Sequence, residues 1–335
     1  MKYLDVKGKG GPDKPPKECK GNKCPPPPPP QPIDACVPGA GDNTSNDPLD
    51  ELYGIVDVNA PASNTWTNSP VTVDIAILDT GADTDHTDLC VHNAVGFTNE
   101  GWEDNHGHGS HTSGTAGARD DNFADGGEVV GVAPTARIWS VKVCTAFGGC
   151  PGDAIVAGID YVTANADQIK VANMSLGGGG SDQPHPQGDC SPITGDAEHL
   201  AICNSVNAGV TYVVSAGNSG ADAAGFTPAA FDEVITVAAS DIDEQPASFS
   251  NYGADVDLIA PGVNIKSTYL NNNYANFSGT SMSSPHVAGG AALYILANPG
   301  STPFEVRDGL VADGRHGWAG QGGLHPEPML DVSKY

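Results

Sequence analysis

The sequence predicts an α/β protein with a mostly parallel central sheet flanked by helices on both faces. Apolar, β-branched runs that are typical of buried parallel strands recur along the chain, at residues 71–78, 138–143, 171–176, 211–216 and 234–240. Helix-like stretches alternate with them, at residues 110–118, 152–165, 194–209 and 281–297. Strands this apolar, separated by helices, indicate a parallel sheet that is covered on both faces. Polar side chains that carry chemistry are then expected at the carboxyl ends of the strands.

The local sequence supports the individual elements in turn. The first strand, VTVDIAIL, runs directly into Asp79, which places that carboxylate at a carboxyl end. The stretch SHTSGTAGA is rich in small residues, which suit a closely packed helix. The last helix begins at Ser281 and has Pro285 in its first turn, where the missing N–H of proline costs nothing. A serine at a helix start is usually only a cap, so Ser281 needs partners before it implies chemistry.

The N-terminal part of the chain differs from the rest in composition. Residues 8–48 lack apolar periodicity and contain six consecutive prolines at 25–30, which gives an extended chain without a core. We therefore expect a Pro-rich, Lys-rich extension or linker over residues 1–48 and one globular domain over residues 49–335. The proline run suits a spacer and also a ligand for proline-reading domains.

The charge of the chain is strongly acidic. It carries 41 acidic and 15 basic residues, for a formal net charge of −26 at pH 7. Such a surface repels nucleic acid and anionic membranes, so neither is an expected partner. The excess of acidic residues is compatible with adaptation to a salty medium, and equally with a role in keeping the protein soluble. The longest small-apolar run, residues 288–297, is too short to span a bilayer.

Eight cysteines without a CxxC pair favour disulfides over a zinc ribbon, and hence an oxidising compartment. We expect a secreted protein whose leader precedes residue 1, because residues 1–30 contain no apolar segment typical of a signal peptide. We expect Cys190 to pair with Cys203 and Cys144 to pair with Cys150, because each pair brackets a short segment of the chain. A third expected pair, Cys36 with Cys90, joins cysteines that lie further apart in the sequence.

Asp79 begins an Asp-Thr-Gly motif, which can be interpreted in more than one way. Aspartic peptidases use two such motifs so that two carboxylates share a proton, but this chain has one, and its strand–helix alternation does not fit an all-β bilobal fold. A zinc hydrolase is a second alternative, because His106, His108 and His111 are close to a dinuclear metallo-hydrolase motif. Ser110 stands where that motif needs an aspartate.

A third interpretation gives Asp79 a histidine base and a serine nucleophile as partners. The order Asp79, His108, Ser281, in AILDTGAD, HGSHTSGT and GTSMSSPHVAG, resembles that of the subtilisin-like serine peptidases, or subtilases. NMSLGG (173–178) and SAGNSG (215–220) resemble the substrate-binding edge and oxyanion loop of the same family. The similarity runs from about residue 52 to about residue 312; it departs from the family in Ser283, where alanine is commoner, and in a long loop at 119–131.

The resemblance implies a subtilisin-like three-layer fold and a secreted serine endopeptidase that works through an acyl-enzyme. Ser281 would be the nucleophile, His108 the general base, and Asp79 the group that orients His108. Asn218 would donate a side-chain hydrogen bond to the oxyanion, alongside the Ser281 N–H. The alternative is a subtilase-fold scaffold without activity, which a disrupted triad or oxyanion residue would favour; all four residues are present.

The resemblance also implies where substrates bind. Ser175, Leu176 and Gly177 would pair with an extended peptide as an added strand, and with Ala216 and Gly217 they would wall the pocket for the residue before the cut. No acidic residue lies in either segment, so we expect broad, apolar-leaning specificity. The expected partners are protein and peptide substrates and the chain's own pro-domain, whose exit MKYLDV resembles; we expect a monomer.

Calcium is the structural ion that the resemblance implies, and no organic cofactor is expected. Asp257 matches the carboxylate that many subtilases use for a cation beside the oxyanion loop, with the Val234 carbonyl as a second ligand and Asp232 nearby. The alternative is that Asp257 is an ordinary surface residue. A second, weaker candidate joins Asp88 to the acidic loop of Asp120, Asp121 and Asn122.

Overall fold

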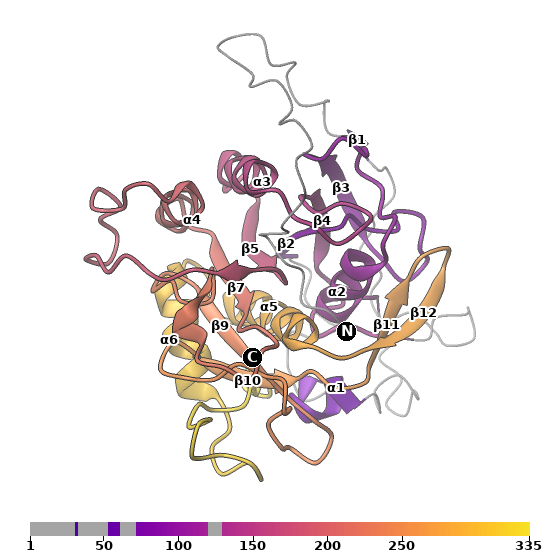
Figure 1. Ribbon diagram of the computed structural model, residues 1–335. Helices are drawn as coiled ribbons and strands as arrows, with labels where there is room; N and C mark the ends of the chain where they lie inside the picture. Colours follow the sequence, from indigo (N-terminus) through magenta and orange to yellow (C-terminus); the bar gives the residue numbers. More distant parts are fainter. Residues whose placement is uncertain (1–30, 33–52, 61–71, 120–128) are drawn as a thin grey trace.

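The computed structural model describes residues 31–32, 53–60, 72–119 and 129–335 (Figure 1). At its centre is an eight-stranded sheet with the order β1-β3-β4-β2-β5-β7-β9-β10. Strand β1 pairs antiparallel with β3, and all the other neighbours are parallel, as the sequence predicts. From edge to edge the strands are β1 (Gln31–Pro32), β3 (Val91–Gly96), β4 (Arg137–Lys142), β2 (Asp74–Asp79), β5 (Ile169–Met174), β7 (Thr211–Ser215), β9 (Ile235–Ser240) and β10 (Leu258–Pro261).

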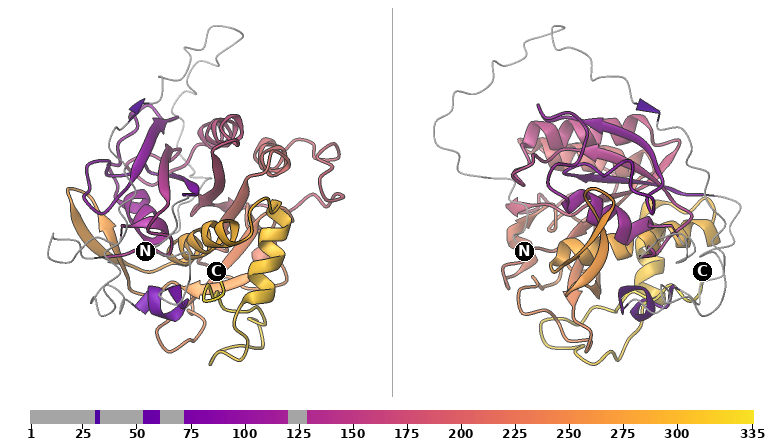
Figure 2. Two further views of the ribbon diagram at one scale, coloured as in Figure 1. Left: turned by 180° about the vertical axis from the view of Figure 1, so that it is seen from behind. Right: turned by 90° about the vertical axis from the view of Figure 1, so that its right-hand side faces the viewer.

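Strand β2 shows how the sheet builds two cores. Successive side chains of a strand point to opposite faces. Ile75 and Ile77 accordingly join the apolar cluster under α2, α5 and α6, whereas Ala76 and Leu78 join the cluster under α3 and α4. All six residues of β2 are buried. Helices therefore cover both faces and the fold has three layers, which confirms the predicted class (Figures 1 and 2).

The helices largely match the expected ranges. They are α1 (Tyr53–Asp57), α2 (His108–Gly117), α3 (Gly152–Ala164), α4 (Ala197–Asn207), α5 (Thr280–Ala297) and α6 (Pro303–Asp313). Helix α6 was not among the expected helices, although Thr302 and Glu305 form a capping box around Pro303 at its start. Within the described residues, no helix is both long and apolar enough to cross a membrane.

A hairpin of β11 (Ile265–Tyr269) and β12 (Asn273–Phe277) packs against α2. Its turn contains Asn271 and Asn272, both in the left-handed region with φ of 60° and 56°, a conformation that asparagine tolerates better than most residues. A smaller pair joins β6 (Gly178–Gly179) to β8 (Phe226–Thr227), so the segment after β5 lies beside the segment before β9.

Two of the expected disulfides are present. Cys144 pairs with Cys150 across a six-residue separation, and Cys190 pairs with Cys203 across 13 residues. Cys90 is also disulfide-bonded. Its predicted partner, Cys36, lies outside the described residues, as do Cys19 and Cys24.

Candidate active site

Asp79 and His108 meet at the carboxyl edge of the sheet. Asp79 is the last residue of β2 and His108 is the first residue of α2. The Nδ1 atom of His108 lies 2.8 Å from Asp79 Oδ1 and 2.9 Å from Oδ2. Both side chains are buried, so the pair is shielded from solvent.

The Asp-Thr-Gly motif explains how this contact is held. Thr80 N donates to Asp79 Oδ1 at 2.7 Å, and Thr112 Oγ1 donates to Oδ2 at 3.3 Å. Thr80 Oγ1 accepts from Gly109 N at 2.9 Å, which fastens the start of α2 to the end of β2. Gly81 has a φ of 109°, and a Cβ there would lie 2.8 Å from the Trp102 carbonyl oxygen, so the loop requires glycine.

The Asp79 carboxylate favours the protonated form of His108. Burial alone would lower the pKa of His108, but the adjacent Asp79 carboxylate and its hydrogen bond outweigh burial and raise this pKa above its ordinary value. With Nδ1 facing Asp79, the other ring nitrogen is left for chemistry. That atom, Nε2, is buried and has no hydrogen-bond partner among the described residues.

Asp104 supports the same histidine and was not predicted from the sequence. Its Oδ1 accepts from the backbone N–H groups of His106 and Gly107, each at 2.9 Å. Its Oδ2 accepts from Ser110 N at 2.9 Å and from Ser110 Oγ at 2.7 Å. One buried carboxylate therefore holds the first turn of α2, where His108 lies.

The zinc-hydrolase alternative finds no support in this geometry. The rings of His106 and His108 have centroids 6.2 Å apart, and His111 Nε2 instead contacts the carbonyl oxygens of Ile265 and Ala275, at 2.9 Å and 3.1 Å. Burial lowers the pKa of His111 to about 3. In the part of the chain that the structure describes, the one convergent group of metal-ligating side chains contains none of these three histidines.

Ser281 is the second residue of α5 and is buried. Its Oγ donates to the carbonyl oxygen of Ser175 at 3.3 Å, and Ser175 Oγ donates to the carbonyl oxygen of Ser281 at 2.9 Å. Helix α5 packs against α2, which carries His108. The start of α5 therefore lies directly against the residue that follows β5.

Asn218 is oriented by the residue before Ser281. Asn218 Oδ1 accepts from Thr280 N at 2.8 Å and from Thr280 Oγ1 at 3.0 Å. Thr280 Oγ1 in turn accepts from Gly217 N at 3.1 Å. Because the oxygen of the amide is occupied by Thr280, its NH₂ group is left to donate beside the start of α5.

The expected substrate-binding segments leave the sheet side by side. Ser175, Leu176 and Gly177 follow β5, whereas Ala216 and Gly217 follow β7, the next strand in the sheet. These strands are parallel, with Met174 opposite Val214, so both segments emerge at one edge.

Asn251 fixes the second of these segments and was not predicted. It lies far along the chain, yet its Nδ2 donates to the Ala216 carbonyl oxygen at 2.8 Å. Its Oδ1 accepts from Ser219 N at 3.0 Å and Ala221 N at 3.1 Å. Gly217 has a φ of 107°, and a Cβ there would lie 2.3 Å from Asn251 Nδ2. The loop can therefore sit this close to Asn251 only with glycine.

The candidate calcium ligands lie near one another at the start of β9. Asp257 comes just before β10, and its Oδ2 accepts from Thr236 N at 2.8 Å. Burial raises the pKa of Asp257 to about 7, which indicates a carboxylate with little compensating positive charge. The Asp232 carbonyl oxygen accepts from Arg307 Nη1 at 2.6 Å, so that oxygen is already engaged by a cationic side chain.

The weaker calcium candidate has a different environment. Asp88 is buried, and its Oδ2 accepts from Tyr274 Oη at 2.7 Å. The residues expected to join it, Asp120, Asp121 and Asn122, lie outside the described residues.

The structure brings Asp79 and His108 together at the carboxyl edge of a mostly parallel sheet, and it places Ser281 at the start of a helix that packs against α2, with its Oγ on the Ser175 carbonyl and not on His108. This is the arrangement expected of a serine hydrolase. Comparison with known proteins gives the family, because residues 72–322 match the model of the subtilase family. The chain is 36% identical over 260 residues to Subtilisin Savinase of Lederbergia lenta and 37% identical over 263 residues to Subtilisin DY of Bacillus licheniformis. Each alignment covers 77% of this chain and 89% of the relative.

Solved structures agree with this assignment. The chain resembles a cold-adapted subtilisin-like serine proteinase with a TM-score of 0.63 and 31% identity, over 79% of this chain and 92% of the other. It resembles a protease of Pseudoalteromonas arctica PAMC 21717 with a TM-score of 0.73 and 27% identity, over 86% of this chain and 97% of the other. The chain therefore belongs to the subtilase family and is a serine endopeptidase with the subtilisin-like fold.

Proposed function

We propose that this chain is a secreted endopeptidase that cleaves proteins through an acyl-enzyme on Ser281. The observation that carries the proposal is the contact of His108 Nδ1 with both carboxylate oxygens of Asp79. Residues 49–335 would form the peptidase domain and residues 1–48 an extension. Secretion is supported by the disulfides Cys144–Cys150 and Cys190–Cys203, which are typical of oxidising compartments.

In the first step, Ser281 Oγ attacks the scissile carbonyl carbon and His108 Nε2 takes its proton. Because Nε2 has no other partner within the described chain, it is available for this transfer. The imidazolium that forms is stabilised by Asp79, and it then gives its proton to the leaving amine. Water later attacks the acyl-enzyme, with His108 again acting as the base.

The oxyanion that develops on the carbonyl oxygen would receive two hydrogen bonds. One comes from Ser281 N at the positive end of α5, and the other from Asn218 Nδ2. Thr280 holds the amide of Asn218 in a fixed orientation before substrate arrives. Such preorganised donors need no rearrangement during the reaction.

Substrate would bind as an extended strand along Ser175, Leu176 and Gly177, through main-chain hydrogen bonds that do not depend on its sequence. Ala216 and Gly217 would form the opposite wall of the pocket. Neither segment contributes an acidic side chain that could select a basic residue, so we infer broad specificity with a preference for apolar residues. Its own pro-domain would occupy the same edge as a product-like strand, and the chain would act as a monomer.

Calcium would be held by Asp257 and the carbonyl oxygen of Val234, close to the oxyanion loop. Carboxylate and carbonyl oxygens are the ligands that this hard cation prefers. Bound there, calcium would supply positive charge to a buried carboxylate and would take no part in the chemical steps. No organic cofactor is required.

The proposal is tested by incubating the full chain with casein, with and without a serine-directed organofluoride. We expect hydrolysis that the inhibitor abolishes, and a covalent adduct on Ser281 that peptide mapping locates. An adduct on another residue, or an absence of hydrolysis by the folded, calcium-loaded protein, would contradict the proposal. The latter result would favour an inactive scaffold.

A further inference from the structure

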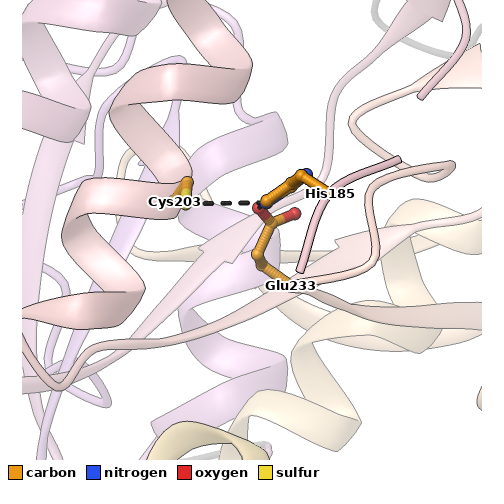
Figure 3. Close-up of side chains that lie close together, drawn as sticks. All are labelled: His185, Cys203 and Glu233. Atoms are coloured by element: carbon orange, nitrogen blue, oxygen red, sulfur yellow. Dashed lines mark hydrogen bonds and ion pairs between the residues drawn. The ribbon is translucent and has the colours of Figure 1, made fainter. Parts of the chain in front are cut away.

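Buried ionisable side chains also occur outside the proposed triad. In one group, Glu233 Oε1 forms an ion pair with His185 Nε2 at 2.6 Å, and Cys203 Sγ lies 3.7 Å from the same nitrogen (Figure 3). The ion pair satisfies the carboxylate, and a disulfide with Cys190 engages the sulfur, so this group fastens its loop and needs no ligand. A different group is centred on Lys142 and adjoins the candidate active site.

Lys142 has an unusual position for a lysine. It is the last residue of β4 and lies beside Asp79, the last residue of β2, in the parallel register of the two strands. Its side chain is fully buried, which is rare for lysine unless the charge is paired. Its Nζ donates to the carbonyl oxygen of Thr80 at 2.6 Å. The ammonium group therefore holds the residue that directly follows the carboxylate of the proposed triad.

The charges around Lys142 are negative. Glu100 Oε2 lies 3.6 Å from its Nζ. Burial lowers the pKa of Lys142 below its ordinary value, whereas the charges of Asp104, Glu100 and Asp79 act in the opposite direction and favour the charged ammonium group. Asp79 contacts His108, and Asp104 holds the turn that carries His108. The buried cation therefore lies near both carboxylates that support the proposed base.

The positive charge of Lys142 also reaches the loop before α2. Burial lowers the pKa of His106, and the charges of His108 and Lys142 lower it further. The rings of His106 and His108 have centroids 6.2 Å apart. Because like charges disfavour one another, Lys142 opposes a second positive charge in this group. The other titratable side chains around His108 are Asp79, Asp104, His106 and His111.

We propose that Lys142 is a positioning residue for the Asp79–His108 pair, because its ammonium group fastens Thr80 and places a positive charge beside two buried carboxylates. This inference rests on the proposed function. Without that charge, the carboxylates of Asp79 and Asp104 would draw a proton into the group at a higher pH. The proton would go to the base or to the carboxylate that orients it, and activity would be lost in either case.

The test compares full-length Lys142→Met, which keeps an unbranched side chain and removes the charge, with Lys142→Arg, which keeps the charge. We expect the kcat of Lys142→Met to fall about 10- to 100-fold with little change in KM, because a displaced base costs rate and leaves substrate binding intact. The acid limb of its kcat/KM profile should move to higher pH by about 0.5–1 pH unit. In Lys142→Arg the limb should stay at the position it has in the parent, even if the rate falls.

Lys170→Met is the matched control. Lys170 lies at the opposite, amino end of the sheet in β5, and its Nζ also donates to a main-chain oxygen, that of Ala166, at 2.5 Å. This control should keep the kcat and the pH profile of the parent. Lys142→Gln is a second neutral variant that retains a donor for the Thr80 carbonyl, and it should move the limb as Lys142→Met does. Circular dichroism reports whether each variant folds.

The outcomes separate this inference from the proposed function. A parent protein without peptidase activity would overturn both. When the parent is active, this inference alone is overturned if the neutral variants of Lys142 keep the acid limb of the parent, or if their kcat equals that of Lys170→Met. Failure of both neutral variants to fold would also overturn it, because Lys142 would then be required by the fold and not by the Asp79–His108 pair.

Discussion

The two carboxylate oxygens of Asp79 lie 2.8 Å and 2.9 Å from the same nitrogen of His108. Because Asp79 ends β2 and His108 begins α2, this contact requires the sheet and the helix layer to be correctly docked. The strand VTVDIAIL alone leaves Asp79 compatible with an aspartic peptidase. Its contact with a buried imidazole instead suits a carboxylate that orients a base.

Replacement of the proposed nucleophile or base should abolish peptidase activity without unfolding the protein. Ser281→Ala and His108→Ala should each lose nearly all kcat/KM, and the double variant should be hardly worse than either single variant, because triad residues act as a unit. Steady-state kinetics on a chromogenic peptide measures this, with circular dichroism as a check on folding. Substantial activity in Ser281→Ala would contradict the proposed mechanism.

Loss of the oxyanion donor should have a smaller effect. Asn218→Ala removes the amide NH₂ that Thr280 orients, and we expect kcat to fall about 100- to 1,000-fold with little change in KM. Thr280→Val keeps the amide but removes the hydroxyl that positions it, so its kcat should lie between those of the parent and Asn218→Ala. A KM effect larger than the kcat effect would indicate that Asn218 binds substrate in its ground state instead.

The acid limb of the pH–rate profile should reflect the environment of His108. The base must be neutral to accept a proton, so kcat/KM falls as the pH drops below the His108 pKa. Asp79 raises that pKa, so the midpoint should lie above the ordinary histidine value of about 6.5. In Asp79→Asn the limb should move to lower pH while the rate falls. A limb that Asp79→Asn leaves in place would show that another group titrates.

The sequence was enough to predict five of the eight strands of the sheet and the candidate triad at the ends of its elements, because these depend on local patterns. Buried β-branched runs marked β2, β4, β5, β7 and β9, and the Asp, His and Ser boxes lie at element ends. Strand β3 was not predicted because VHNAVG is partly exposed and mixed in polarity. Strand β10 was not predicted because LIAP is only four residues long. Helix α6 was not predicted either, although the Thr302–Glu305 capping box at its start can be seen in the sequence and would have indicated it.

The supporting residues could not be predicted in the same way. Asp104 holds α2 by accepting backbone N–H groups that converge only once the loop before the helix has folded. Asn251 reaches Ala216 from 35 residues away, so no local pattern connects the two. Contacts of this kind follow from tertiary packing and are found in the structure.

The role of Asp104 gives a prediction of stability. Asp104→Asn replaces one acceptor oxygen by an NH₂ group that faces N–H donors, and we expect the free energy of unfolding to fall by about 1–3 kcal/mol. Activity should fall as well, because the same carboxylate holds the turn that carries His108. Urea denaturation measures the loss, with Asp243→Asn at an exposed position as the control. Equal stability of the two variants would show that Asp104 is dispensable for the start of α2.

Calcium should stabilise the native protein through Asp257. The carboxylate is partly buried, has one oxygen bonded to Thr236 N, and gains little positive charge from its neighbours, so a bound cation would relieve an uncompensated charge. Because calcium would bind only the folded chain, the melting temperature should rise with calcium concentration. We expect a lower midpoint in excess EDTA than in millimolar calcium. Asp257→Ala should remove most of this difference, and Asp243→Ala should preserve it. An EDTA effect that persists undiminished in Asp257→Ala would place the ion elsewhere, and Asp88 would be the next position to mutate. The absence of an EDTA effect in the parent protein would exclude a structural calcium ion at either position.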